Sequence, residues 1–534
     1  QGAAPGAAAG RTAAAALEED FKDAEVRAAL RGMRPGAAPG LDGLAPCLVK
    51  NAFEVVVDPD GSLRRVFLLD AHLARLSTII LRTRYPPDWN EQPLTPFFKG
   101  KGSGADLHNY RPIQSQCCLA KLFSMLLNAR LYAFAERCGL RAFGQAGFRA
   151  KRSTADNLLV LRHLIDRVRL EPPALGPPRR VRRLFVCFVD FEKAYDSVHR
   201  DALMQYLAAV GVHGDTLATL CDMYWDVRAR PKVGGRLGPA FASTSGVRQG
   251  DPLSPLLFGM YIDRVEKYLA ARAPGAGADL EGWPRLLQVL LFADDLALCS
   301  HSEEGLQTLL DALHTFCISH HLRVNVPKTK VVVFGRKKYA PRQPRTWLYA
   351  GHPIPTASEF RYLGIVLHST KGCGPAVAHQ RAAALRAMGA LQGRCHALGV
   401  VDFALRTRLF RALIEPLLTY GAEIWAPDLM SSLQAALCSP PQVLQNAFIR
   451  RFAGLRGCTP ALVLCAESGL PPLPASWMRA CARLWNRAAG LGEASSGHAL
   501  LECTLRADIS LAARLPPADA HRTWAGALNR SLAA

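Results

Sequence analysis

The sequence predicts an α+β fold in which a small sheet carries helices on one face. The run LFVCFVD at 184–190 is apolar and rich in β-forming residues, which indicates a buried strand that ends at an aspartate. Residues 286–300 contain two apolar runs on either side of an Asp-Asp pair, the pattern of a hairpin. Residues 197–210 and 303–320 have helical spacing, and 330–335 are predicted to form a further strand. This order of strand, helix, hairpin, helix and strand is typical of a compact α+β core.

Length and charge limit the kinds of protein that this chain can be. At 534 residues it is long enough for two or three packed units. Its 65 Lys and Arg against 44 Asp and Glu give a net charge of +21, which favours a polyanionic partner, nucleic acid before membrane. No apolar run approaches the roughly 20 residues that span a bilayer, so no membrane partner is expected. The 15 cysteines show no paired framework and no CxxC motif, which predicts reduced thiols and no zinc site.

Changes in composition divide the chain into four regions. Residues 1–30 begin with a Gly- and Ala-rich run and are predicted to be a low-complexity flanking segment. Residues 31–95 form an N-terminal extension, in which 63–82 have the spacing of a helix, and residues 80–367 hold the predicted core. Residues 371–534 are predicted to be helical and carry 17 basic residues against 9 acidic ones, as expected of a nucleic-acid-binding region. The chain starts with Gln rather than Met, and we expect it to be a piece of a longer protein.

Three aspartates stand at the ends of predicted strands. Asp190 ends one strand, and Asp294 and Asp295 lie at the bend of the hairpin. If the strands are neighbours, three carboxylates meet at one edge, where their repulsion calls for a cation such as Mg²⁺. Two such ions can hold the oxygens of an in-line phosphoryl displacement. Taken alone, however, Asp-Asp between apolar runs is more often an ordinary hairpin turn with two solvated charges.

Several motifs, in one collinear order, extend the argument beyond the aspartates. Residues 30–490 resemble the reverse transcriptases of non-LTR, or LINE-type, retrotransposons. The segments that carry the resemblance are APGLDGLAPCLVK (38–50), NYRPIQSQCCLAKLFSMLLNARL (109–131), QAGFRAKRSTADNL (145–158), VDFEKAYDSVHR (189–200), SGVRQGDPLSPLLF (245–258), FADDLAL (292–298), VNVPKTKVVVF (324–334), FRYLG (360–364) and YGAEIW (420–425).

The resemblance implies a right-hand polymerase with fingers, a ferredoxin-like palm and a helical thumb. Residues 80–367 would be the reverse transcriptase domain, comprising fingers and palm, and 371–534 the thumb with a helical C-terminal extension. Asp190, Asp294 and Asp295 would be catalytic and would bind two Mg²⁺ ions, or Mn²⁺ in their place. The backbone carbonyl of Phe191 is implied as a further metal ligand, and Asp295 as the more peripheral of the three acids.

The resemblance also implies residues that bind the incoming nucleotide. Lys99 and Arg111 correspond to finger cations that grip a triphosphate, and Lys101 is a rival to Lys99. Tyr195 would lie under the sugar and exclude a 2′-hydroxyl. Gln249 and Gly250 would contact the nucleotide or template, since Gly permits close backbone approach. Lys328 would act as a general acid near the pyrophosphate, with Lys330 as its rival.

The function implied is RNA-directed DNA synthesis from a 3′-hydroxyl primer. Its partners would be template RNA, a DNA primer and deoxynucleoside triphosphates, and arginines such as Arg381, Arg386 and Arg394 would contact phosphates of the duplex. A group II intron-type or telomerase-like polymerase is the alternative among enzymes. A decayed or domesticated copy that binds nucleic acid without catalysis is the alternative among binding proteins.

Location in the nucleus is expected, with the cytoplasm as the alternative for a ribonucleoprotein. The basic runs RRVRR (179–183) and GRKK (335–338) are candidate import signals.

Overall fold

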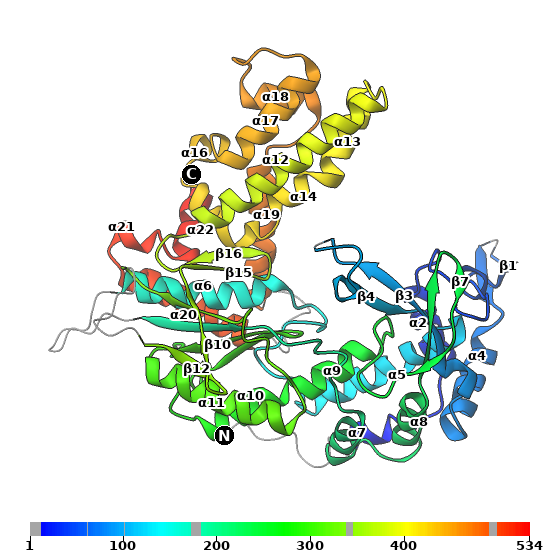
Figure 1. The fold of residues 1–534 in the computed structure, drawn as a ribbon. Coiled ribbons are helices and arrows are strands. Elements are labelled where there is room, and N and C mark those ends of the chain that lie inside the picture. The colour runs from blue at the N-terminus through cyan, green and yellow to red at the C-terminus, as the bar shows by residue number, and fades with distance from the viewer. Residues whose placement is uncertain are drawn as a thin grey trace. The chain divides into compact units, whose positions relative to one another are not determined.

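The computed structural model of the chain describes residues 12–60, 62–100, 102–171, 183–337, 345–490 and 499–533. The chain forms two compact units, each assembled from separate segments (Figure 1). Unit 1 consists of residues 1–142, 191–267 and 315–323, and unit 2 of residues 143–190, 268–314 and 324–534. The regions predicted from composition are continuous in sequence, whereas these units are not, because contacts between distant segments define a packed body. The division falls within α10 (Arg264–Arg272) and α11 (Glu303–Ser319).

Unit 1 is mainly helical and contains one five-stranded sheet. Its elements in chain order are α2 (Asp23–Gly32), α3 (Pro46–Lys50), β1 (Phe53–Val57), β2 (Leu63–Phe67), α4 (Asp70–Arg82), η1 (Pro87–Asn90), β3 (Glu91–Phe98), η2 (Leu107–Asn109), β4 (Tyr110–Gln114), α5 (Cys118–Arg137), α7 (Arg200–Ala209), α8 (Gly214–Trp225), β6 (Arg228–Val233), β7 (Arg236–Leu237), β8 (Phe241–Ala242) and α9 (Ser254–Ile262).

Helix α5 forms the core of unit 1. Among the described residues it is the one helix that is long and apolar enough to cross a membrane by length and composition. More than half of that stretch is buried within the unit, however, and α5 packs against α2 and α9. Its apolar residues therefore serve a protein core, where a helix is apolar on several faces because neighbours surround it.

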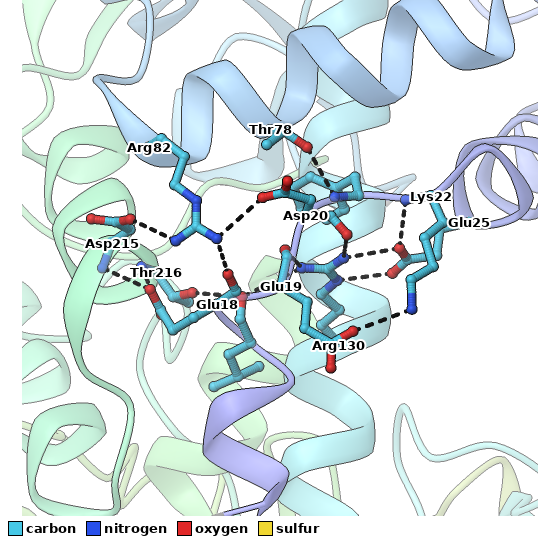
Figure 2. A network of polar contacts seen from close by, with 12 residues as sticks. Glu18, Glu19, Asp20, Lys22, Glu25, Thr78, Arg82, Arg130, Asp215 and Thr216 are labelled. Carbon is cyan, nitrogen blue, oxygen red and sulfur yellow. Dashed lines mark hydrogen bonds and ion pairs between the residues drawn. The ribbon is translucent and has the colours of Figure 1, made fainter.

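The segment before α2 is packed into unit 1, although the composition of residues 1–30 predicts a flanking segment. Within it, Leu17 and Phe21 are buried, and the backbone N–H of Phe21 donates to Thr78 Oγ1 at 2.9 Å. Arg130 of α5 donates to both oxygens of Glu25, at 2.8 and 2.9 Å, and to the carbonyl of Asp20 (Figure 2). The bidentate pair and the carbonyl contact fix the path of the chain into α2.

A second arginine holds the other side of the same segment. Arg82 of α4 forms ion pairs with Asp20 and Asp215, at 3.1 and 3.0 Å, as Figure 2 shows. The carboxylate of Glu18 accepts hydrogen bonds from the backbone N–H groups of Asp215 and Thr216, at the first turn of α8. A helix N-terminus favours an anion because its N–H groups lack partners within the helix.

Two sheets complete unit 1. The strand order of the larger sheet is β4-β3-β6-β7, with β8 also paired to β6. Strands β1 and β2 form a separate antiparallel hairpin in which Phe53 faces Phe67. The prediction of a helix over 63–82 is wrong for 63–67, which pair with β1, and right for α4. Val66 and Phe67 are strand-forming residues, and their spacing with the apolar residues of α4 is compatible with either structure.

Unit 2 contains a second five-stranded sheet and the C-terminal helices. Its elements, besides parts of α10 and α11, are α6 (Thr154–Leu170), β5 (Leu184–Val189), β9 (Val289–Phe292), β10 (Asp295–Ser300), β11 (Lys330–Phe334), β12 (Trp347–Tyr349), β13 (His352–Ile354), β14 (Thr356–Ala357), β15 (Glu359–Tyr362), β16 (Ile365–His368), α12 (Gly374–Ala397), α13 (Phe403–Leu413), α14 (Glu415–Thr419), α15 (Ala422–Trp425), η3 (Ala426–Leu429), α16 (Leu433–Leu437), α17 (Pro440–Ala453), α18 (Ala461–Ser468), α19 (Leu473–Ala488), α20 (Ala499–Arg514), α21 (Pro517–Ala520) and α22 (Trp524–Ala533).

The sheet of unit 2 has the strand order β14-β11-β5-β10-β9, with β5 at its centre. All six residues of β5 are buried, so both faces of the sheet are covered rather than the one face predicted. Helix α6 lies on one side of these strands and α11 on the other (Figure 1). Phe188 stacks on Phe360 at 4.4 Å on one face, while Phe185 contacts Trp347 on the other.

The C-terminal helices share one hydrophobic core with α6 and the sheet. Trp425 of α15 packs edge to face with Trp477 of α19, and both side chains are fully buried. Trp524 of α22 stacks on Trp485 and donates its indole N–H to the carbonyl of Glu423. The helical structure predicted for residues 371–534 is confirmed in the described part of that region, and these aromatic contacts join α22 to α15 and α19 within one hydrophobic core.

Candidate active site and nucleotide-binding residues

Strand pairing in unit 2 places the three predicted aspartates together. Strands β5 and β10 are antiparallel neighbours, with Val189 opposite Leu296. One step further along the same register, Asp190 is opposite Asp295. Asp294 lies in the two-residue turn between β9 and β10, directly before Asp295. The sheet therefore gathers three carboxylates at one edge, as the sequence predicted.

The hairpin turn before Asp294 is held in an unusual conformation by a buried glutamine. Ala293 has a φ of 56°, in the left-handed region that non-glycine residues seldom adopt. Its N–H donates to Gln145 Oε1 at 2.9 Å, and the same oxygen accepts from Gly147 N at 2.8 Å. The side chain of Gln145 is fully buried. Gln145 thus fixes the backbone from which the carboxylate of Asp294 projects.

The segment that supplies Gln145 runs along the hairpin at very close range. Residues 144–146 exchange backbone hydrogen bonds with Leu291, and Gln145 forms a parallel bridge with it. A Cβ atom on Gly147 would lie 2.2 Å from the backbone nitrogen of Ala293, so only glycine fits there. Gln145 and Gly147 were not among the predicted site residues. The signal for them was the motif QAGF itself, which pairs a polar side chain with a glycine two residues later.

Electrostatics at this edge are those of a cation site. Burial, followed by the charges of Asp294 and Asp190, raises the pKa of Asp295 to about 6. Within the described part of the chain, no three His, Cys, Asp or Glu side chains form a closed metal-binding group. Carboxylate oxygens are nevertheless ligands that Mg²⁺ prefers, and this ion completes its shell with water and phosphate oxygens. The side chains at this edge are therefore of the right chemical type for magnesium, and its binding there remains a prediction.

Of the two lysines that compete for the acid role, Lys328 reaches the carboxylates. Its ammonium lies 3.7 Å from Asp190 Oδ2, and its side chain is 70% exposed. Lys330 lies within β11, where it pairs with Phe188 on the neighbouring strand. The turn that carries Lys328 is anchored by Asn325, whose N–H donates to the carbonyl of Asp190 at 2.7 Å. The geometry therefore favours Lys328 over Lys330.

Tyr195 lies in unit 1, on the segment that follows Asp190 and Phe191. Its ring stacks on Phe258 of α9 with centroids 4.6 Å apart and planes 18° apart. Its carbonyl accepts a hydrogen bond from Val247 N at 2.9 Å. A Cβ atom on Gly246 would lie 2.7 Å from Asp196 Cα, so a glycine is required where the two segments touch. The stacked ring and the close backbone contact fix the orientation of Tyr195.

Gln249 and Gly250 connect that segment to the finger strands within unit 1. Gln249 Nε2 donates to Asp196 Oδ1 at 2.9 Å, and its carbonyl accepts from Gln114 N at 2.7 Å. Gly250 has a φ of 121°, and a Cβ atom there would lie 2.4 Å from the carbonyl oxygen of Gln114. Glycine is needed at this position for backbone packing. Its role in nucleotide contact remains a prediction.

Two arginines that carried no predicted role position this loop, and of these Arg248 is buried and Arg200 half-buried. Arg200 donates to the carbonyls of Gly246 and Ser245, both at 3.0 Å. Burial, with the charge of Arg248, lowers the pKa of Arg200 to about 10. Arg248 is 2% exposed and donates to Asn90 Oδ1 and to the carbonyl of Met223. Both arginines lie within segments that carry the family resemblance. Their positions depend on contacts with α8 and η1, which are distant in sequence.

The two finger cations lie on one hairpin of unit 1. Arg111 is exposed on β4, where it is paired with Phe97 of β3. Lys99 follows β3, and its ammonium donates to the carbonyl of His108 at 2.8 Å. Lys101, the rival of Lys99, lies outside the described residues. The hairpin brings Lys99 and Arg111 to the same end of the finger sheet.

The predicted site residues thus fall into two groups. Unit 2 contains Asp190, Asp294, Asp295 and Lys328, whereas unit 1 contains Lys99, Arg111, Phe191, Tyr195, Gln249 and Gly250. The chain passes from one group to the other between Asp190 and Phe191. Phe191 is buried, and its role as a carbonyl ligand remains a prediction.

Comparison with known proteins decides what this arrangement represents. The family described as reverse transcriptase (RNA-dependent DNA polymerase) matches residues 99–367, half of the chain. The chain belongs to the reverse transcriptase family. That match includes both groups of site residues, and it confirms the predicted right-hand polymerase class with its mixed helices and sheets.

The relatives of this reverse transcriptase are proteins of non-LTR retrotransposons. A probable RNA-directed DNA polymerase from transposon BS of Drosophila melanogaster is 25% identical over 71% of this chain and 40% of that protein. The Pol polyprotein of element R2DM, from the same fly, is 27% identical over 64% of this chain and 30% of that protein. An R2 polyprotein of Popillia japonica is 28% identical over 42% of this chain and 36% of its own length. The LINE-type resemblance is confirmed, and the chain spans less than half the length of these relatives.

Proposed function

We propose that the chain copies an RNA template into DNA from a 3′-hydroxyl primer. The observation that carries the proposal is the register of β5 and β10, which brings Asp190 to Asp295 with Asp294 in the adjoining turn. In a reverse transcriptase, this edge is where a divalent cation is needed. Mg²⁺ ions bound there would activate the primer hydroxyl and stabilise the departing pyrophosphate.

The residues of unit 2 would have separate roles in that reaction. Asp190 and Asp294 would hold the ions, and Asp295, with its raised pKa, would assist from the edge of the group. Gln145 would keep the turn at Ala293 in place, so that the carboxylate of Asp294 does not have to reorganise during the reaction. Lys328, exposed and 3.7 Å from Asp190, would donate a proton to the leaving pyrophosphate.

The residues of unit 1 would select and orient the nucleotide and template. Tyr195, held flat against Phe258, would exclude a ribose 2′-hydroxyl by steric contact. Arg111 and Lys99 would bind the triphosphate of a deoxynucleotide, Arg through paired hydrogen bonds and Lys as a point charge. Template RNA and primer DNA would contact exposed arginines of α12, among them Arg381, Arg386 and Arg394.

Nuclear action is part of the proposal, because the relatives are proteins of transposable elements. The candidate import signal RRVRR lies almost entirely outside the described residues, and the last residue of GRKK also lies outside them. Cell fractionation of the chain with both basic runs replaced by Gln would test this part. Equal nuclear amounts of the parent and the variant would contradict it.

Primer extension on an RNA template tests the enzymatic proposal. The parent chain should extend a DNA primer in the presence of Mg²⁺, and Asp294→Asn should reduce the rate by about 10³-fold or more. Asp311→Asn, an exposed carboxylate on α11 of the same unit, is the matched control and should retain activity. No extension by a folded parent, together with retained RNA binding, would favour the decayed copy instead.

Nucleotide selection provides a second, independent measurement. Tyr195→Val should increase incorporation of ribonucleotides relative to deoxynucleotides, since the ring that blocks the 2′-hydroxyl is removed. Phe258→Leu is the informative partner variant, because it leaves Tyr195 in place but removes its stacking surface. Unchanged discrimination in Tyr195→Val would sink the role assigned to this ring.

A further inference from the structure

Unit 2 contains a cavity that is formed by other elements than those that carry Asp190, Asp294 and Asp295. Its volume is about 260 Å³, and its lining comes from α6, from β16 and the loop after it, from α15 and η3, and from α22 and the loop before it. Five cationic side chains line it: Arg162, Arg169, Lys371, Arg522 and Arg530. The carboxylates in the lining are Asp166 and Asp428. Positive charge is therefore in excess around this space.

The two carboxylates are already committed to one arginine at the floor of the cavity. Arg162 donates from Nη2 to Asp428 at 2.5 Å and from Nε to Asp166 at 3.1 Å. Its Nη1 donates to the carbonyl of Ile424. Arg162 is 5% exposed, and this group of one arginine and two carboxylates satisfies its own contacts, so it forms the floor of the cavity rather than a site for a ligand.

The remaining cations are less fully compensated within the described part of the chain. Arg169 donates from Nη2 to two neutral acceptors, the carbonyls of His368 and Lys371, and the charge of Asp166 acts on it through space. The Nε atoms of Arg169 and Arg530 are buried and have no hydrogen-bond partner. Arg522 is paired with Asp519 at 3.1 Å, but its side chain is 62% exposed, which weakens that pair. Buried N–H groups of this kind are normally satisfied by protein, water or ligand.

The electrostatics around the cavity reflect burial and an excess of cations. Burial lowers the pKa of Arg169, and the charges of Arg162 and Arg522 add to this effect against the opposing charge of Asp166. Burial, followed by the charge of Lys371, lowers the pKa of His368. Apolar side chains cover the rest of the wall, including Ile165, Leu367 and Ile424. The cavity thus combines more cations than carboxylates with an apolar surface suited to a flat, uncharged group.

We propose that this cavity binds the phosphate group of a single nucleotide. Arginine suits phosphate because its planar fork donates two parallel hydrogen bonds. A volume of about 260 Å³ is close to the lower limit of small-ligand pockets, which admits one nucleotide and excludes a duplex. The phosphate could come from a free mononucleotide or from the 5′-phosphorylated end of an RNA strand. Neither source requires the polymerase reaction, so the inference goes beyond the proposed function.

Direct binding without metal tests the site separately from catalysis. In EDTA, adenosine 5′-monophosphate should bind at least about tenfold more tightly than adenosine, measured by calorimetry. The double variant Lys371→Glu and Arg522→Glu should lose that difference. The double variant Arg451→Glu and Arg479→Glu changes the net charge equally at exposed positions of α17 and α19, and should keep it. Equal affinity for both ligands, or equal loss in both double variants, would overturn the proposal.

A strand-end measurement separates the two sources of phosphate. Short RNA with a 5′-phosphate is compared with the same RNA bearing a 5′-hydroxyl, again in EDTA. A preference for the 5′-phosphate that disappears in the Lys371→Glu and Arg522→Glu variant assigns the site to a strand end. No such preference, with the mononucleotide still bound, assigns it to free nucleotides. Arg530→Gln, which removes one cation but no ion pair, should weaken binding in either case, and unchanged binding would contradict the site.

Discussion

Two regions of this molecule place their carboxylates in opposite electrostatic surroundings. In unit 1, Glu18, Asp20 and Glu25 are each matched by an arginine or by the N–H groups of a helix terminus (Figure 2). At the sheet edge of unit 2, Asp190, Asp294 and Asp295 lie together, and burial, followed by the charges of Asp294 and Asp190, raises the pKa of Asp295. The paired carboxylates of unit 1 stabilise the fold. The three carboxylates of unit 2 repel one another, and a bound cation would reduce that repulsion.

This difference provides a way to distinguish carboxylates that stabilise the fold from carboxylates that take part in a reaction. A structural carboxylate should contribute stability and nothing to chemistry, whereas a functional one should contribute chemistry at some expense of stability. Substitutions in the two regions should therefore have opposite signatures. The following predictions test that contrast.

Removing a carboxylate from the sheet edge should have the largest effect, and only on activity. Asp190→Asn should lower the primer-extension rate by about 10³-fold, equivalent to about 4 kcal/mol of transition-state stabilisation. The melting temperature should stay the same or rise, because one like-charge repulsion disappears. Calorimetry and steady-state kinetics on the same preparation check both parts. A marked fall in melting temperature would show that Asp190 is structural.

Removing an arginine from the unit 1 network should have the reverse signature. The side chain of Arg130 is 9% exposed, and Arg130→Met would remove the arginine donor from Glu25 and from the carbonyl of Asp20. The expected loss is about 3 kcal/mol of unfolding free energy, measured by urea denaturation. Arg137→Met, on the exposed last turn of α5, is the matched control and should change little. Equal unfolding free energies of the two variants would show that the Arg130 network does not stabilise unit 1.

Replacing Gln145 should have an intermediate effect, because its side chain contacts only the backbone but positions the turn that carries Asp294. Gln145→Leu should lower kcat by about 10–100-fold, or roughly 1.4–2.7 kcal/mol, with the nucleotide KM little changed. Gln442→Leu is the matched control, since Gln442 is also fully buried and accepts from a backbone N–H, that of Leu473 at 2.8 Å. Both variants should lose stability, and only the first should lose kcat. Parallel losses of kcat in the two would contradict the positioning role.

The smallest expected effect is the pH dependence of the unit 1 network. Burial acts to raise the pKa of Glu25, but hydrogen bonding and charge from Arg130 lower it overall below its ordinary 4.5. Glu25 therefore contributes stability above that pH and loses it as the pH falls through the folded-state pKa. After allowance for solvent screening, we expect about 0.5–1 kcal/mol. Glu25→Gln should flatten this part of the stability profile, and an unchanged profile would argue against the ion pair.

Much of the chemistry could be predicted because it is encoded in local motifs. The strand ending at Asp190 is a continuous apolar run, and the Asp-Asp pair stands between two others, so strand ends and carboxylates coincide in the sequence. The finger cations and the segment around Gln249 were equally visible, because their spacing resembles that of a known family. Secondary structure was less reliable where patterns are ambiguous, as at residues 63–67, which form a strand although they continue a helical spacing.

The sequence by itself determined the family, the candidate catalytic carboxylates and the positive charge, since these depend on residue type and order. Tertiary structure alone decided that Asp190 is opposite Asp295, that Lys328 lies beside Asp190, and that Gln145 holds the turn. It also decided that residues 12–30 are packed into unit 1 and that cations from three parts of the chain surround one cavity. These features depend on contacts between residues distant in sequence, and side-chain burial and hydrogen-bond geometry are set only when those segments pack together.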